Sequence, residues 1–123
     1  LCQDLKNVDI FISDVKSPAH LDAKLLNNYE VIIDDGSHLI HDVYIAFDFF
    51  WDRLAKGGAY IIEDTSCFDN QSYIDNFLDE QRPLNHKLEK RVFLEYLQLK
   101  VQSGSSAASL LIYKNLWILK KNR

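Results

Sequence analysis

The sequence predicts an α/β domain whose sheet contains parallel strands. Two apolar runs, residues 31–33 and 59–62, are unbroken by charged side chains, and each is followed by two acidic residues. Such runs are typical of parallel strands that are covered on both faces. A helical repeat lies between them, and a strand-like stretch at residues 8–14 precedes a short helical one. Strands that alternate with helices in this way favour an α/β architecture.

Length and composition indicate one ordinary globular domain. The chain has 123 residues, of which 47% are hydrophobic and 26% are charged. A net charge of −4 gives no electrostatic reason to bind nucleic acid or an anionic membrane. No apolar run approaches the roughly 20 residues that span a bilayer. Cys2 and Cys67 have no metal-type spacing, so we expect reduced thiols and a cytoplasmic protein. The chain contains no methionine, not even at position 1, and we expect it to be a piece of something longer.

The first half of the chain follows a strand–helix–strand order. Residues 8–13 alternate as a strand does, and Pro18 is suited to the first turn of a helix that runs to residue 26. Residues 31–34 form the next strand. Together these elements predict a βαβ unit.

A strongly amphipathic helix follows the turn at Gly36. Apolar residues recur at three- and four-residue spacing as far as Leu54, and the other face carries Asp42, Asp48, Asp52 and Arg53. The apolar stripe includes Phe47, Phe50 and Trp51, which we interpret as core rather than as a stacking platform. We expect this helix to end at Gly57 and Gly58, because glycine readily adopts the left-handed helix cap. The strand at residues 59–63 then follows at once.

The second half contains two further helices and a hairpin. Ser72 and Asp75 resemble a capping box that begins a helix reaching Arg82. Residues 85–102 favour a helix, although residues 97–101 alternate like a strand. The remaining segments are a loop at 103–106 and an antiparallel hairpin with strands at 109–113 and 116–120.

Acidic side chains gather at the ends of two predicted strands. Asp34 and Asp35 end the first, and Glu63 and Asp64 end the second. Ligands of open α/β sheets bind beyond the carboxyl ends of the strands. Carboxylates hold hard divalent cations, and a nearby histidine such as His38 can take a proton. The sequence therefore predicts a metal site or an acid–base site at this edge of the sheet.

Two motifs carry a resemblance to a known family. Residues 31–38 (VIIDDGSH), a phenylalanine-rich helix and residues 56–64 (KGGAYIIED) are similar to the macrocin O-methyltransferase family. These are class I S-adenosylmethionine-dependent enzymes that methylate sugars on macrolides and related natural products, and cephalosporin-hydroxylase-like proteins share much of the layout. Residues 111–120 resemble the closing hairpin of the family. The resemblance covers most of residues 8–120. It implies a Rossmann-like class I methyltransferase sheet, mostly parallel, with a C-terminal antiparallel hairpin.

The resemblance also implies roles for the acidic residues and the histidine. Asp35 and Asp64 would bind Mg²⁺, and Glu63 would be a third ligand or support one. His38 would be the general base that takes the proton of a hydroxyl group on a small acceptor. Asp34 would face S-adenosylmethionine, although the sequence leaves open which of Asp34 and Asp35 takes the metal. Asp14 stands where the family has an acid near the adenine, but Ser13 replaces the usual glycine before it.

Other departures from the family pattern concern the N-terminal part of the domain. The glycine-rich cofactor loop has no counterpart here, nor has an acidic-tipped strand for the ribose hydroxyls. We therefore expect residues 1–123 to be a single partial methyltransferase domain that lacks its first strands and does not catalyse methyl transfer alone. The strand at 31–34 would then have an open edge. Residues 8–13 or a second copy of the chain would pair there.

Several plainer readings remain open. Asp35 and Asp64 can simply cap the elements that follow them, and His38 can be a surface or capping residue. His41 is the alternative base, and Cys67 has no base at a known spacing. At the level of the whole chain, the alternatives to an O-methyltransferase are a degenerate module without catalysis and a carboxylate-metal hydroxylase or hydrolase.

Overall fold

The computed structural model describes residue 14 and residues 27–72, 86–102 and 107–123. The elements are, in order, β1 (Tyr29–Asp34), α1 (Ile40–Trp51), β2 (Leu54–Glu63), the 3₁₀ helix η2 (Thr65–Asp69), α3 (His86–Gln102), β3 (Ala107–Ile112) and β4 (Leu116–Lys121). The predicted strand at 8–13, the helix at 18–26, the helix beyond Ser72 and the loop at 103–106 lie outside the described residues. No described helix is both long enough and apolar enough to cross a membrane.

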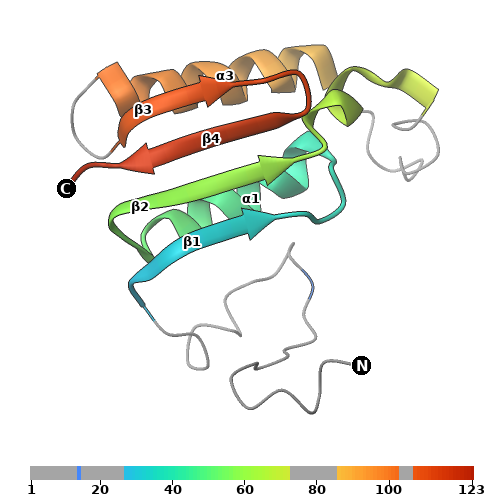
Figure 1. The fold of residues 1–123 in the computed structure, drawn as a ribbon. Helices are drawn as coiled ribbons and strands as arrows, with labels where there is room; N and C mark the ends of the chain where they lie inside the picture. The colour runs from blue at the N-terminus through green and yellow to red at the C-terminus, as the bar shows by residue number, and fades with distance from the viewer. Residues whose placement is uncertain (1–13, 15–26, 73–85, 103–106) are drawn as a thin grey trace, which may run out of the picture.

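The strands form one sheet in the order β1-β2-β4-β3 (Figure 1). β1 and β2 are parallel and are joined through α1, which confirms the two predicted parallel strands and the amphipathic helix between them. Most of the βαβ unit predicted over residues 8–34 lies outside the described residues, so that unit stays a prediction. β4 pairs antiparallel with both β2 and β3, which confirms the hairpin. The described sheet is thus mixed: one of its three pairings is parallel and two are antiparallel, whereas the sequence predicts a mostly parallel sheet.

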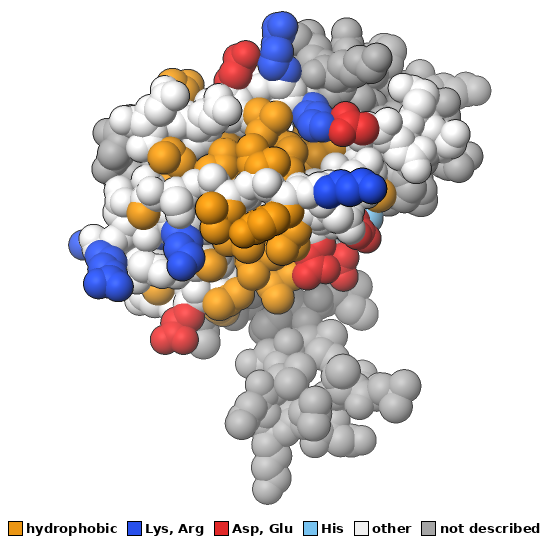
Figure 2. Space-filling model, turned by 45° about the horizontal axis from the view of Figure 1, so that its top comes forward, with side chains coloured by type: hydrophobic (Ala, Val, Ile, Leu, Met, Phe, Trp, Pro, Cys, Tyr) orange, Lys and Arg blue, Asp and Glu red, His pale blue; other side chains and the backbone are white. Residues whose placement is uncertain are grey.

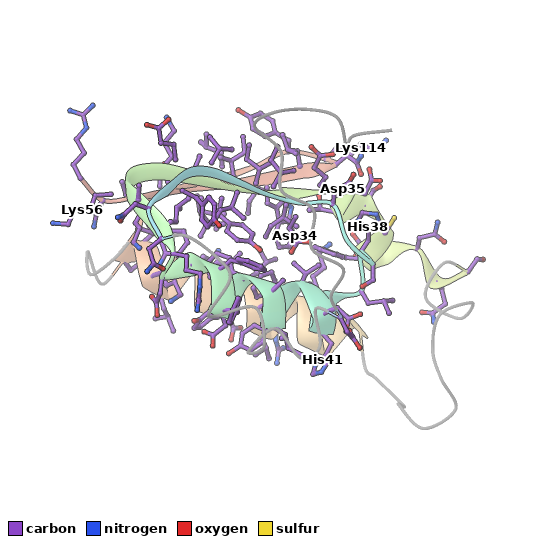
Figure 3. The ribbon with its side chains drawn as sticks, turned by 90° about the horizontal axis from the view of Figure 1, so that it is seen from below. Asp34, Asp35, His38, His41, Lys56 and Lys114 are labelled. Atoms are coloured by element: carbon purple, nitrogen blue, oxygen red, sulfur yellow. The ribbon has the colours of Figure 1, made fainter. Side chains whose placement is uncertain are left out.

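Both described α-helices cover the same face of the sheet. Figure 3 shows the sheet edge-on above α1 and α3. The core between these layers is aromatic. Phe47 is fully buried, and its ring centroid lies 5.0 Å from that of Tyr60 and 5.1 Å from that of Trp51. Phe47 and Trp51 are therefore core residues, as predicted, and Phe50 packs against the core while remaining partly exposed. The largest buried side chains are Trp51, Tyr60, Phe47, Phe93, Ile40, Ile62, Leu97 and Leu119.

The opposite face of the sheet carries a row of aliphatic side chains. The register aligns Ile33 with Ile61, Ile61 with Ile118, and Ile118 with Leu111, one residue from each strand. Ile33 is 57% exposed and Leu111 is 41% exposed. Hydrophobic side chains gather on this side of the molecule among charged groups (Figure 2). The described helices thus leave one apolar face of the sheet open.

The junction between α1 and β2 differs from the prediction. The helix ends at Trp51, Leu54 begins β2, and Gly57 and Gly58 lie inside that strand rather than at a helix cap. A lysine from the last strand replaces the glycine cap: Lys121 Nζ donates to the carbonyl oxygens of Trp51 (3.0 Å) and Leu54 (2.8 Å). A cation at a helix C-terminus also interacts favourably with the helix dipole.

The helix α3 settles the ambiguous stretch at residues 97–101, which is helical. The strand alternative is wrong because the buried positions recur four residues apart, at Phe93 and Leu97. Those two side chains join the core under the sheet. The exposed Leu99 belongs to the alternating pattern but not to the buried face.

Candidate metal and acid–base site

Three side chains converge at the carboxyl ends of β1 and β2. Asp35 directly follows β1, Asp64 directly follows β2, and His38 lies in the connection to α1. Each offers one ligand atom, and these atoms all lie within 4.8 Å of one another. His38 Nε2 is 3.8 Å from Asp35 Oδ1 and 3.7 Å from Asp64 Oδ2. The parallel pairing of β1 with β2 explains the convergence, because it brings both strand ends to the same edge.

The two distances from His38 Nε2 are too long for direct hydrogen bonds, and the two carboxylates lie close enough together to share one cation. Hydrogen bonds from nitrogen to oxygen are usually about 2.7–3.2 Å long. Mg²⁺ holds its ligands octahedrally at about 2.1 Å, so neighbouring ligands are about 3 Å apart and opposite ligands about 4.2 Å apart. The ligand atoms of Asp35 and Asp64 lie within 4.8 Å of each other, so both carboxylates can approach one position. This geometry agrees with a site in which Asp35 and Asp64 share one cation, and their role as metal ligands stays a prediction.

The backbone at His38 and Asp64 is in the left-handed region, which aspartate tolerates better than histidine does. Among the described residues, three non-glycine residues have positive φ: Asn28, His38 (53°) and Asp64 (51°). A side chain in the left-handed region costs roughly 1–2 kcal/mol unless it is glycine, asparagine or aspartate. Such conformations persist where the surroundings hold them, and they cluster at functional sites. The strain at His38 in particular supports a functional reading over that of a simple surface residue.

Asn115, in the turn between β3 and β4, contacts Asp64 directly. Its Nδ2 donates to Asp64 Oδ1 at 2.7 Å, and its Oδ1 accepts from Ser66 N (3.2 Å) and Ser66 Oγ (2.5 Å). The sequence reasoning missed this residue, because Asn115 reads only as a turn residue of the hairpin. It is 51 positions from Asp64, and no local pattern links the two.

Ser37 and Asp42 hold the turn that carries His38. Ser37 Oγ donates to Asp42 Oδ2 at 2.8 Å and accepts from the N–H of Leu39 at 3.3 Å. Asp42 is only 4% exposed, so its predicted place on the polar face of α1 is wrong. Asp42 turns inward because its carboxylate accepts the hydrogen bond from Ser37, which precedes the helix. The helix dipole also favours a negative charge in this first turn.

Asp34 has a different environment from Asp35. It lies between the sheet and α1 (Figure 3), where Tyr60 Oη donates to its Oδ2 at 3.2 Å. Burial raises the pKa of Asp34, and the hydrogen bonds from Tyr60 and from the N–H of Gly36 only partly offset this. The residue lines a groove of about 510 Å³ along β1, whose other lining residues include Ile32, Ala46, Phe50 and Tyr60. Asp35, and not Asp34, is therefore the residue grouped with His38 and Asp64.

The remaining candidates do not belong to this close group of Asp35, His38 and Asp64. Glu63 ends β2 and is half-buried, but it does not join the close group among the described residues. Asp14 is exposed, and its role, like that of Glu63, stays a prediction. His41 points away from His38, on the far side of α1 (Figure 3). Burial, and then the nearby carboxylate of Asp64, raise the pKa of the Cys67 thiol, which disfavours a nucleophilic thiolate.

Comparison with known proteins gives matches of two kinds. No protein-family profile matches the chain. A curated relative from Streptomyces olivaceus, 8-demethyl-8-alpha-L-rhamnosyl tetracenomycin-C 2'-O-methyltransferase, is 37% identical over 59 residues, which is 46% of this chain and 16% of the relative. Among solved structures, the MycE methyltransferase from the mycinamycin biosynthetic pathway, in complex with Mg, SAH and mycinamycin VI, matches with a TM-score of 0.71. It is 25% identical over 99% of this chain and 35% of MycE.

The fold is that of a methyltransferase. A further crystal form of MycE with Mg and SAH matches equally well, with a TM-score of 0.71 at 22% identity. A protein from Corynebacterium glutamicum matches less closely, with a TM-score of 0.55 at 22% identity over 86% of this chain and 45% of that protein. These matches confirm the resemblance to O-methyltransferases that the two sequence motifs carry. The chain spans about a third of the length of MycE and 16% of the curated relative.

Proposed function

We propose that the chain is part of an S-adenosylmethionine-dependent, magnesium-assisted O-methyltransferase that acts on a sugar or another small hydroxylated natural product. The observation that carries the proposal is the convergence of Asp35, His38 and Asp64 at the carboxyl edge of a methyltransferase sheet. The relatives support it: MycE was solved with Mg, SAH and a mycinamycin, and the curated relative is a 2'-O-methyltransferase.

The donor set fits magnesium. Asp35 and Asp64 supply hard carboxylate oxygens, and Mg²⁺ typically takes one or two carboxylates while keeping several waters or substrate oxygens. Glu63, beside Asp64 in the chain, would complete or support this set. Bound there, Mg²⁺ would lower the pKa of an acceptor hydroxyl and fix its direction.

His38 is positioned to take the proton. Its Nε2 faces both carboxylates at less than 4 Å, so a hydroxyl held between Asp35 and Asp64 would lie near the imidazole. The imidazole ring of histidine is a common general base in enzymes. The acceptor oxygen, once deprotonated, is the nucleophile for methyl transfer.

The groove beside β1 is the proposed place for the cofactor. Its volume of about 510 Å³ lies within the usual range of roughly 300–1,000 Å³ for small-molecule sites. Its lining is mostly apolar, and Asp34 supplies a carboxylate next to the metal site. Asp14 would contribute a second acid toward the same molecule.

The proposal extends to further features of the complete protein. The edge of β1 is suited to pairing with a second copy of the chain, which would make the protein a homo-oligomer. The acidic net charge favours a small-molecule acceptor over nucleic acid or membrane. We place the protein in the cytoplasm, as its two cysteines predict. The intact Asp–His–Asp group favours an enzyme over a degenerate module without catalysis.

The deciding experiment measures methyl transfer from S-adenosylmethionine by the complete enzyme as a function of Mg²⁺ concentration. We expect activity to require Mg²⁺, and Asp64→Asn to need far more of it, because a neutral amide is a much weaker ligand for a hard cation. Asp69→Asn is the matched control, since Asp69 is an exposed acid paired with Lys90. Metal-independent transfer, or identical Mg²⁺ curves for all three proteins, would contradict the proposed site.

A further inference from the structure

We propose that Asn115 is a positioning residue that holds the carboxylate of Asp64 in its metal-binding orientation. The inference rests on the proposed function, since it assigns Asn115 a part in the same site. The sequence analysis gives Asn115 no role beyond the predicted closing hairpin, and the residue lies in the turn between β3 and β4.

The first argument is that the two carboxylate oxygens of Asp64 have different neighbours. Asn115 Nδ2 donates to Oδ1 at 2.7 Å, while Oδ2 is the oxygen that faces His38 at 3.7 Å. A carboxylate fixed through one oxygen cannot rotate freely, so its other oxygen stays directed at the shared centre. Partners of this kind orient ligand side chains at metal sites.

The second argument is that the direction of the Asn115 amide is determined. Its oxygen accepts from the backbone N–H of Ser66, which can only donate, and from Ser66 Oγ. The NH₂ group must therefore point the other way, toward Asp64, whose ionised carboxylate can only accept. The reversed amide would place oxygen against oxygen, so the network allows one orientation alone.

The third argument is that the hairpin turn is a firm support. The turn is closed by Tyr113 N donating to Leu116 O at 2.8 Å, and Thr65 N donates to the backbone oxygen of Asn115 at 3.4 Å. Just beyond it, Trp117 is buried and packs edge-to-face on Phe68 of η2, with 5.2 Å between the ring centroids. The segment that begins with Asp64 is thus joined to the hairpin by hydrogen bonds and by aromatic packing.

Manganese titration followed by electron paramagnetic resonance tests the inference on the full-length protein. Asn115→Ala should weaken Mn²⁺ binding by roughly tenfold, the lower end of the effect of removing a partner of a metal ligand. Ser66→Ala keeps the backbone N–H that orients the amide, so its affinity should change far less. Gln98→Ala, which truncates an exposed amide on α3, is the matched control and should bind as the wild type does.

A second measurement keeps the test decisive if Asn115→Ala folds poorly. In the wild type, the side-chain amide resonances of Asn115 should shift on addition of Mg²⁺ with the same midpoint as those of His38, and the amide of Gln98 should not. Wild-type protein that binds neither Mn²⁺ nor Mg²⁺ would overturn the proposed function itself. Metal binding that leaves the Asn115 amide unmoved, or that is equal in folded Asn115→Ala, would overturn only the positioning role.

Discussion

His38 combines a proposed catalytic role with an unfavourable backbone. Its φ of 53° is a conformation that asparagine tolerates better than histidine does. The surrounding structure holds it there through the Ser37–Asp42 bond on one side and the buried start of α1 on the other. Strain of this kind is expected where function, rather than stability, selects the residue.

Replacement of His38 should therefore separate stability from activity. In the complete enzyme, His38→Asn should fold at least as stably as the wild type and lower turnover by roughly 10²–10⁴-fold, the usual scale for losing a general base. Cofactor binding should change little. Initial rates and thermal denaturation, with His41→Asn as control, measure both effects. If turnover survives in His38→Asn and falls in His41→Asn, the base is His41.

The sequence identified most of this site at residue scale, but not its supports. Asp35, His38 and Asp64 were found because each stands directly at or just after the end of a recognisable strand. Asn115 and Asp42 were not, because their roles depend on contacts that the local pattern does not contain. Asn115 contacts Asp64 because β4 pairs with β2, a pairing far apart in the sequence, and Asp42 turns inward to a serine where helical periodicity predicts an outward position.

At the scale of elements, the start of β2 shows how a distant residue can change a boundary. A glycine pair after an amphipathic repeat predicts a helix cap, yet Lys121 caps α1 and the glycines enter the strand. The register shifts here, since Tyr29 pairs with Leu54 but Val31 pairs with Ala59. The centres of β1, β2, β3 and β4 agree with the predicted strands, because apolar runs determine the centres of strands more firmly than their ends.

The two glycines should differ sharply in their tolerance of substitution. A Cβ at Gly58 would lie 2.8 Å from the carbonyl oxygen of Glu30 and 3.0 Å from that of Ala55, and backbone atoms cannot swing aside. Gly58→Ala should therefore destabilise the fold by about 1–3 kcal/mol. Gly57 has a φ of 77°, and a Cβ there would make only an ordinary contact, 3.7 Å from Cγ of Arg123. Asparagine tolerates this left-handed backbone better than most side chains, so Gly57→Asn should cost about 1 kcal/mol or less. Urea denaturation of both variants checks this, and equal midpoints would show that the close approach does not constrain the strand.

At the scale of the whole molecule, the two faces of the sheet differ in how far the described helices cover them. One face carries the aromatic core beneath α1 and α3, while the other presents Ile33, Ile61, Ile118 and Leu111 in one row. Parallel strands with near-continuous apolar runs normally have both faces covered. The sequence predicted such runs correctly, but it could not say what lies over the second face. The predicted strand at 8–13, next to β1, falls outside the described residues.

This open face leads to a prediction for the 123 residues expressed alone. Apolar surface of this extent favours association, because burying it against another copy removes it from water. We expect the isolated chain to form oligomers as its concentration rises, and to bind an apolar fluorescent dye. The double variant Ile33→Thr, Leu111→Thr keeps β-branched or strand-compatible side chains while removing apolar area from two exposed positions, so it should shift association to higher concentration.

Sedimentation velocity over a range of concentrations measures the shift. Leu99→Gln is the matched control, because Leu99 is 60% exposed but lies on α3 and not on the open face. Loss of association in the double variant and not in the control would assign the contact to the sheet face. If the wild-type chain stays monomeric and binds no dye, the row from Ile33 to Leu111 is covered by the chain itself. If both variants associate as the wild type does, the contact lies outside the row from Ile33 to Leu111.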